Sequence, residues 1–128
     1  MTDVLIIEPD EASARLYASA LEAVGCKTRV CFDTQTALLE LDKQPAEVIV
    51  LELDIPWHNG FEFLYEFISY DDWVDIPFVV HTSVRLDLLD KMLVKWSELN
   101  VAVCLYKADT TLAKLQSAIR GASLAAVK

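Results

Sequence analysis

The chain has 128 residues, of which 54% are hydrophobic and 24% are charged, and its net charge is −9. This length predicts one domain, covering residues 1–128, that buries a core without disulfides or a structural metal. The acidic balance argues against nucleic acid or an anionic membrane as a partner, because phosphate contacts need a basic patch.

Short apolar runs alternate along the chain with segments of helical period, which is typical of βα units and a parallel sheet. The predicted strands are 4–7, 26–31, 47–53, 76–81 and 101–106, and the predicted helices are 11–25, 34–43, 61–69, 84–100 and 111–126. Right-handed crossovers between parallel strands then predict a doubly wound α/β fold. We expect a five-stranded parallel sheet inside a (βα)5 three-layer sandwich.

Local signals mark the ends of several helices. Asp10, Asp33 and Asp109 each stand where an N-cap is expected, and Gly25 stands where the first helix would stop. In that helix, apolar residues recur at roughly helical spacing at Ala14, Leu16, Tyr17, Leu21 and Val24.

The cysteines and the amino terminus indicate the cellular setting. Cys26 and Cys31 lie in one predicted strand and face opposite ways, so we expect reduced thiols. The first ten residues, "MTDVLIIEPD", lack the basic and apolar segments of a signal peptide. No apolar stretch reaches the roughly 18 residues that cross a bilayer. We therefore expect a cytoplasmic protein that does not enter membranes.

Polar residues stand at the ends of four predicted strands, at Glu8, Glu52, Thr82 and Lys107. The carboxyl ends of parallel strands share one edge of a sheet, which is where α/β folds usually bind ligands. Two carboxylates suit a divalent cation, and a lysine with a threonine suits an anion bound beside it. The alternative is that Lys107 only forms a structural ion pair with Glu52.

These residues and their spacing resemble the receiver domain of bacterial two-component response regulators. The match covers essentially the whole chain and comprises Glu8, the turn "ELDIPWHNG" at 52–60, Thr82 and Lys107. The resemblance implies the flavodoxin-like fold of the chemotaxis regulator. It also implies a phosphorelay role without enzymatic activity, with a sensor histidine kinase or a downstream signalling protein as partner. It places Glu52 at the phosphoacceptor position and Asp54 in the adjoining turn, where the family uses a backbone carbonyl for metal.

Two departures from the family affect its chemistry. The family has a phosphoaccepting aspartate where this chain has Glu52, and Pro9 replaces the second of two acids that bind Mg²⁺. One extra methylene moves the carboxylate by roughly 1.5 Å, and misplacement by about 1 Å can cost roughly a hundredfold in rate. We therefore expect a pseudo-receiver that is not phosphorylated, with Mg²⁺ bound weakly or not at all by Glu8 and Glu52. The longer side chain is expected to reach Lys107 or Thr82 in place of a phosphoryl group.

Two further departures lie near Lys107. The aromatic position three residues earlier holds Cys104, for which Tyr106 is one alternative, and the proline that follows the lysine is replaced by Ala108. A cis bond without proline costs roughly 3–4 kcal/mol, so we expect a trans Lys107–Ala108 bond.

The predicted helix 84–100 carries more apolar residues than one buried stripe requires: Leu86, Leu88, Leu89, Met92, Leu93, Val94, Trp96 and Leu99. The excess predicts a partner surface. We expect this surface to include Leu88, Lys91, Met92, Lys95 and Tyr106, and to mediate binding of a partner or formation of a homodimer.

Other interpretations are compatible with the same residues. Paired carboxylates followed by Thr82 and Lys107 also resemble phosphohydrolases with an aspartate nucleophile, although Glu52 and the missing cap domain argue against an enzyme. A third possibility is a phosphorylatable receiver whose aspartate was changed to Glu52 by engineering. We expect His58 and His81 to be surface and sheet residues, and Trp57 either to cover the pocket or to meet a partner.

Overall fold

The computed structural model describes residues 1–56, 59–91 and 96–127 of the chain. Their five strands form one parallel sheet in the order β2-β1-β3-β4-β5. The strands are β1 (Asp3–Ile7), β2 (Lys27–Cys31), β3 (Val48–Leu51), β4 (Phe78–Thr82) and β5 (Val101–Tyr106). This is the doubly wound flavodoxin-like α/β fold that the alternation of strands and helices predicts. Because β3 ends at Leu51, Glu52 is the first residue beyond the strand.

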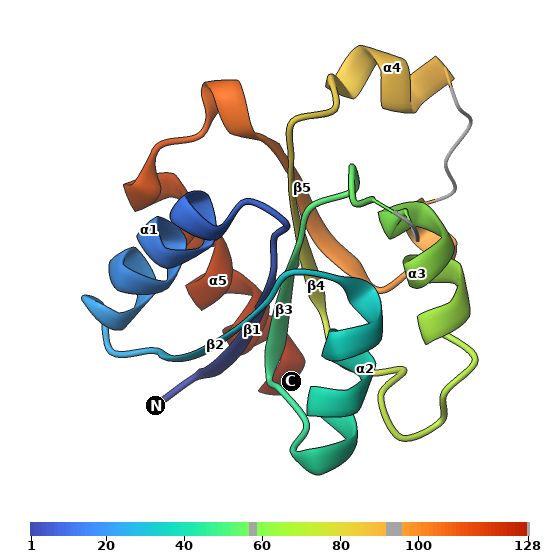
Figure 1. The fold of residues 1–128 in the computed structure, drawn as a ribbon, viewed down its shortest axis with the longest axis horizontal. Coiled ribbons are helices and arrows are strands. Elements are labelled where there is room, and N and C mark those ends of the chain that lie inside the picture. The colour runs from blue at the N-terminus through green and yellow to red at the C-terminus, as the bar shows by residue number, and fades with distance from the viewer. Residues whose placement is uncertain (57–58, 92–95, 128) are drawn as a thin grey trace.

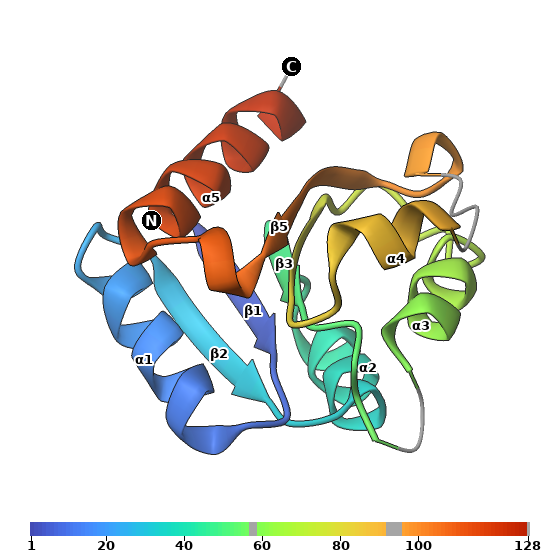
Figure 2. The same cartoon turned by 90° about the horizontal axis from the view of Figure 1, so that it is seen from above.

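Helices cover both faces of the sheet (Figures 1 and 2). One face carries α1 (Glu11–Glu22) and α5 (Leu112–Val127), and the other carries α2 (Thr34–Lys43), α3 (Gly60–Phe67) and α4 (Leu86–Lys91). Two short 3-10 helices, η1 (Trp96–Glu98) and η2 (Lys107–Asp109), flank β5. None of the helices within the described ranges is long and apolar enough to cross a membrane.

The prediction of one continuous helix over 84–100 is wrong. The structure has α4 only over Leu86–Lys91, residues 92–95 lie outside the described residues, and Trp96–Glu98 is a 3-10 helix. The Trp96 ring lies 6.3 Å from the ring of Phe61, beside the start of α3. The chain must turn back there to enter β5 at Val101, and a tight 3-10 turn is a common connector.

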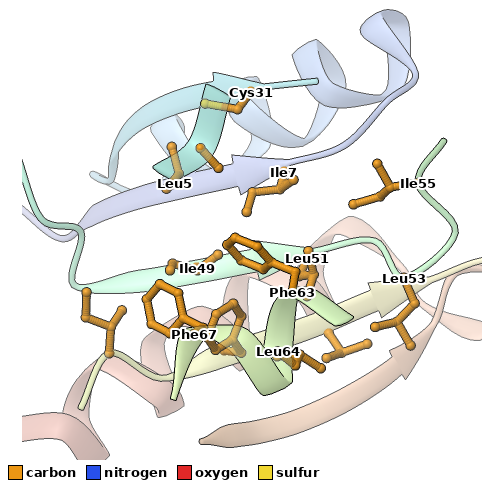
Figure 3. Packing of buried hydrophobic residues seen from close by; sticks show 14 of the residues in the cluster. Leu5, Ile7, Cys31, Ile49, Leu51, Leu53, Ile55, Phe63, Leu64 and Phe67 are labelled. Atoms are coloured by element: carbon orange, nitrogen blue, oxygen red, sulfur yellow. The ribbon is translucent and has the colours of Figure 1, made fainter. Parts of the chain in front are cut away.

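Each strand sends alternate side chains to the two faces of the sheet. In β1, Val4 and Ile6 join the cluster under α1 and α5, whereas Leu5 and Ile7 join the cluster on the other face. Figure 3 shows this second cluster, in which Phe63 and Phe67 of α3 lie over β3. Both rings also contact the Phe78 ring of β4. Fully buried residues on both faces explain why the central strands are continuous apolar runs.

The first two predicted N-caps are present. Asp10 accepts a hydrogen bond from Ser13 N at 2.9 Å, and Asp33 accepts one from Thr36 N at 2.7 Å. Gly25 has a φ of 91°, a left-handed conformation that suits the stop after α1. All three cysteines are reduced thiols, as predicted.

The predicted N-cap at Asp109 is wrong. Asp109 lies in η2, and Thr111 caps α5 instead, accepting from Lys114 N at 3.1 Å. In α1, Leu16 is 53% exposed and Val24, just beyond its end, is 40% exposed, although both follow the apolar spacing. Single exposed apolar side chains are common on protein surfaces, so spacing alone does not identify the buried face.

Candidate functional site

Polar residues from four strand ends meet at the carboxyl edge of the sheet. Glu8 follows β1, Glu52 follows β3, Thr82 ends β4 and Lys107 follows β5. Lys107 Nζ donates to the carboxylates of both Glu8 and Glu52, at 2.8 Å from Glu52 Oε1, and the Thr82 hydroxyl donates to Glu52 Oε2. We call these four residues the strand-end cluster.

The Glu52 carboxylate is buried, with 3% of the residue exposed, and it accepts five hydrogen bonds. The donors are Ser83 N at 2.9 Å and Lys107 Nζ at 2.8 Å on Oε1, with Leu53 N at 2.7 Å, Asp54 N at 3.1 Å and the Thr82 hydroxyl on Oε2. A carboxylate offers about four lone-pair sites, so Glu52 has its acceptor capacity filled by these donors.

The backbone turn that supplies two of these donors depends on Gly60. The Gly60 N–H donates to the Leu53 carbonyl at 2.9 Å and draws the start of α3 against the end of β3. A Cβ at position 60 would lie 2.6 Å from Leu53 Cα and 2.9 Å from the Glu52 carbonyl oxygen. Only glycine therefore permits this approach, which holds the turn after β3 in place.

Lys107 connects the two carboxylates of the cluster. Glu8 is 3% exposed and its Oε2 accepts from Asp10 N at 3.1 Å, which leaves Oε1 for the ammonium. The Lys107 side chain is 21% exposed, so its charge is largely shielded from water. Of the two interpretations left open for Lys107, the ion pair is formed, and it extends to Glu8 as well as Glu52.

The hydrogen bonds in the cluster determine its protonation. Burial alone would raise the pKa of Glu52, but donors from Lys107, Thr82 and the backbone outweigh burial and hold the pKa below its ordinary value of 4.5. Burial alone would lower the pKa of Lys107, but its bonds to the two carboxylates raise the pKa above 10.5. Both groups therefore stay charged at neutral pH.

His81 lies in the sheet, as predicted, and makes a contact that the sequence does not reveal. Its ring meets the Tyr17 ring edge-on with centroids 4.7 Å apart, and Lys107 Nζ lies 5.8 Å from the same Tyr17 ring. Burial, with the nearby Lys107 charge, lowers the pKa of His81 to about 4, against a smaller opposing influence of Glu52. His81 is therefore neutral at physiological pH, and the Tyr17 ring on α1 lies near both His81 and Lys107.

The remaining residues singled out near the site have different positions. Asp54 is exposed and contributes its backbone N–H to Glu52. Cys104 packs partly buried against the core on the α3 face, and Tyr106 is paired with Thr82 in the ladder between β4 and β5. The Lys107–Ala108 peptide bond is trans.

The predicted partner surface is described only in part. Leu88 is 45% exposed on α4, Lys91 is exposed at its end, and Tyr106 is half-buried on β5. Met92 and Lys95 lie outside the described residues, as do Trp57 and His58. The exposed surface of α4 also includes Leu86, which is 41% exposed.

The donor set of the cluster does not suit Mg²⁺, the ion implied by the family resemblance. Magnesium needs oxygen lone pairs in near-octahedral array at about 2.0–2.1 Å. Here Glu52 is filled by five donors, and the Oε1 atoms of Glu8 and Glu52 converge on an ammonium nitrogen. Within the described part of the chain, no group of three or more His, Cys, Asp or Glu side chains is placed to hold a metal ion.

Comparison with known proteins supports the receiver resemblance. The KDP operon transcriptional regulatory protein KdpE of Escherichia coli (strain K12) is 33% identical over 92 residues, which cover 72% of this chain and 39% of KdpE. The chain therefore spans well under half of the length of this relative. No family model matches the sequence.

Solved structures share the fold over almost the whole chain. A sensor protein from Polaromonas sp. JS666 superposes with a TM-score of 0.89 and 20% identity, covering 98% of both chains. A response regulator receiver domain from Clostridium thermocellum has a TM-score of 0.82 and 18% identity, covering 98% of this chain and 96% of the other. With this fold and its similarity in sequence to KdpE, the chain is a response regulator receiver domain of the two-component type.

Proposed function

We propose that this receiver domain signals by protein–protein contact and does not accept a phosphoryl group, with Glu52 as a permanent anion at the phosphoacceptor position. The observation that carries this proposal is the saturation of the Glu52 carboxylate by five donors, two of which are Thr82 and Lys107. The family resemblance assigns these two residues to the phosphoryl group, and here the carboxylate itself holds them.

The same geometry argues against Glu52 as a nucleophile. Attack on phosphorus needs a lone pair directed at the phosphoryl group, and each Glu52 oxygen already accepts at least two hydrogen bonds. Freeing one oxygen would break bonds inside a buried ion pair, which typically costs several kcal/mol when a partner is lost. The chain therefore acts as a signalling module and carries no enzymatic activity of its own.

The proposed output is a contact made by α4, β5 and α5. Leu86 and Leu88 are exposed apolar side chains on α4, and Lys91 adds a charge at its end. Between β5 and α5 lies a groove of about 530 Å³, lined by Leu105 and Lys114 among others. Apolar surface with charge at its rim suits binding of a sensor histidine kinase, a downstream signalling protein or a second copy of the chain.

Incubation with acetyl phosphate and Mg²⁺, followed by intact mass measurement, tests the chemical part of the proposal. The parent and Glu52→Gln are expected to stay unmodified. The double variant Glu52→Asp with Pro9→Asp, which restores the shorter acceptor and the second acid, is expected to gain one phosphoryl group. A phosphorylated parent whose modification disappears in Glu52→Gln would contradict the proposal.

Sedimentation at several concentrations and capture of a candidate kinase test the output surface. Charge reversal at Lys91 and Lys95 is expected to weaken self-association or capture. Lys43→Glu, an exposed change on α2, serves as the matched control. A monomer at all concentrations, together with unchanged capture in the reversed variants, would show that the surface is not used.

A further inference from the structure

We propose that the Lys107 ammonium is the resident cation of the strand-end cluster, and that Glu8 and Glu52 bind no divalent metal while Lys107 is present. This inference concerns the same site as the proposed function but goes beyond it. A receiver can fail to be phosphorylated and still bind Mg²⁺, so the two statements are tested separately.

The positions of the carboxylate oxygens carry the inference. Glu8 Oε1 and Glu52 Oε1 come from different strand ends, and both accept from the same atom, Lys107 Nζ. The two oxygens therefore converge on a single point, which is the arrangement that a divalent cation would need. Lys107 fills that point with a positive charge that is covalently attached to the chain.

The second oxygen of each carboxylate has other partners. Glu8 Oε2 accepts from Asp10 N at 3.1 Å, and Glu52 Oε2 accepts from Leu53 N, Asp54 N and the Thr82 hydroxyl. A metal ion cannot recruit these oxygens without releasing backbone N–H groups at the start of α1 or in the turn after β3. Pro9, between Glu8 and Asp10, offers no side-chain ligand to compensate.

Electrostatics oppose exchange of the ammonium for a metal. A divalent ion at the convergence point would force the Lys107 ammonium away from two buried carboxylates that both accept a hydrogen bond from it. Mg²⁺ also gives up its bound water reluctantly. Displacing Lys107 would therefore bring it few protein oxygen ligands. An attached cation has the further advantage that it loses no translational entropy on binding.

Replacing Lys107 by methionine keeps most of the side-chain length but leaves two buried carboxylates facing one uncharged point. Such a site has two uncompensated negative charges, from Glu8 and Glu52, and removal of one partner from a buried ion pair is strongly destabilising. A divalent cation would relieve this charge, so Lys107→Met should convert the cluster into a metal site.

Thermal unfolding in millimolar MgCl2 or MnCl2, compared with NaCl of equal ionic strength, tests this directly. The parent midpoint is expected to be the same in all three salts. Lys107→Met is expected to melt lower than the parent in NaCl and to recover part of the difference in MnCl2 and MgCl2, because a ligand that binds only the folded state raises its stability. Lys43→Met, at an exposed lysine on α2, should behave as the parent does.

Mn²⁺ binding measured by electron paramagnetic resonance gives a second readout. The affinity of Lys107→Met for Mn²⁺ is expected to exceed that of the parent by about tenfold or more, the factor that 1.4 kcal/mol corresponds to. Saturable binding of Mg²⁺ or Mn²⁺ to the parent at sub-millimolar concentration would overturn the inference. A folded Lys107→Met that binds Mn²⁺ no better than the parent would overturn it as well.

If Lys107→Met does not fold, the parent alone decides the matter. The Cε resonance of Lys107 can be followed by NMR at neutral pH, and its chemical shift is expected to stay the same as MgCl2 is added. A chemical-shift change that saturates with MgCl2 would show that the metal displaces the ammonium. A parent that takes a phosphoryl group but ignores Mg²⁺ would contradict only the proposed function.

Discussion

The strand-end cluster and helix α4 lie on neighbouring parts of the molecule and are held in opposite ways. In the cluster, Glu8, Glu52 and Thr82 are each at most 3% exposed and bonded to one another or to Lys107. In α4, Leu89 is 1% exposed, whereas Leu86 and Leu88 are more than 40% exposed. The cluster is thus fixed by buried charge, whereas the described part of α4 is attached mainly through the buried side chain of Leu89.

This difference separates two tasks within one domain. Buried and saturated charges hold the four strand ends in one arrangement, and under the proposed function this arrangement needs neither a phosphoryl donor nor a metal ion. The exposed apolar side chains of α4 remain available to a partner. Substitutions should therefore change stability strongly in the cluster and weakly in α4, while effects on partner binding should follow the reverse order.

The largest loss of stability is expected from Glu52→Ala. Removing one partner of a buried ion pair costs about 3–5 kcal/mol. Here the change leaves Thr82 and three backbone donors without their acceptor and Lys107 with Glu8 alone. The free energy of unfolding in urea measures this loss. Glu11→Ala, which breaks a pair with Arg15 in which the two side chains are 64% and 72% exposed, should cost less than about 1 kcal/mol. Equal losses in the two variants would contradict the distinction between the regions.

Acidification should reveal the burial of His81. Its pKa of about 4 in the folded chain lies below the ordinary 6.5, so between these values the unfolded chain binds a proton that the folded chain does not. Stability is therefore fully present above pH 6.5 and falls as the pH drops toward 4, by at most about 3 kcal/mol. Urea unfolding of the parent and of His81→Leu across this range should show a shallower fall in the variant. Parallel curves of unfolding free energy against pH in the parent and the variant would show that groups other than His81 cause the loss of stability.

Gly60 and Gly121 provide a pair of opposite expectations. Gly60→Ala places a Cβ against Leu53 and the Glu52 carbonyl, so it should destabilise the chain by about 1–3 kcal/mol through overpacking at the turn. Gly121 lies within α5, and a Cβ added there would meet no described atom outside its own helix backbone within 4 Å. Gly121→Ala should therefore stabilise the chain by about 0.5–1 kcal/mol. An unaffected Gly60→Ala would show that backbone approach at the turn is not limiting, and a destabilised Gly121→Ala would show that the space beside α5 is not open to a Cβ.

The smallest effect on stability is expected from Leu88→Asp in α4. A 45% exposed side chain away from the core should change the free energy of unfolding by about 0.5 kcal/mol or less. Capture of a partner or self-association should nevertheless fall. Leu39→Asp, at a 66% exposed position on α2, is the matched control and should leave binding unchanged. Loss of binding in the Leu39 variant alone would move the partner surface to α2.

Most of the architecture could be predicted because strands buried on both faces are continuous apolar runs with polar residues at their ends. The polar residues at the ends of these apolar runs also predicted that Glu8, Glu52, Thr82 and Lys107 share one edge of the sheet. Helix 84–100 could not be delimited in this way, because its apolar residues lie on more than one face and give no signal for the 3-10 turn at Trp96.

Other parts of the site depend on interactions that side-chain identity does not encode. Three donors to Glu52 are backbone N–H groups, and two of them lie in the turn that Gly60 permits. The sequence also left open whether Lys107 pairs with Glu52 or the carboxylates bind a metal, since both need the same residue types. Contacts of His81 with Tyr17 depend on the packing of α1 against the sheet, which strand periodicity does not specify.

A pH titration of the Glu52 side chain most directly tests whether its carboxylate is a permanently held anion. The Cδ carbon, followed by NMR in the parent, is expected to titrate below the ordinary glutamate value of 4.5, with an unchanged curve in the presence of Mg²⁺ and acetyl phosphate. Thr82→Val, which removes one donor, should raise this pKa. Titration at or above 4.5, or a new Glu52 resonance after addition of Mg²⁺ and acetyl phosphate, would contradict a carboxylate held by Thr82 and Lys107.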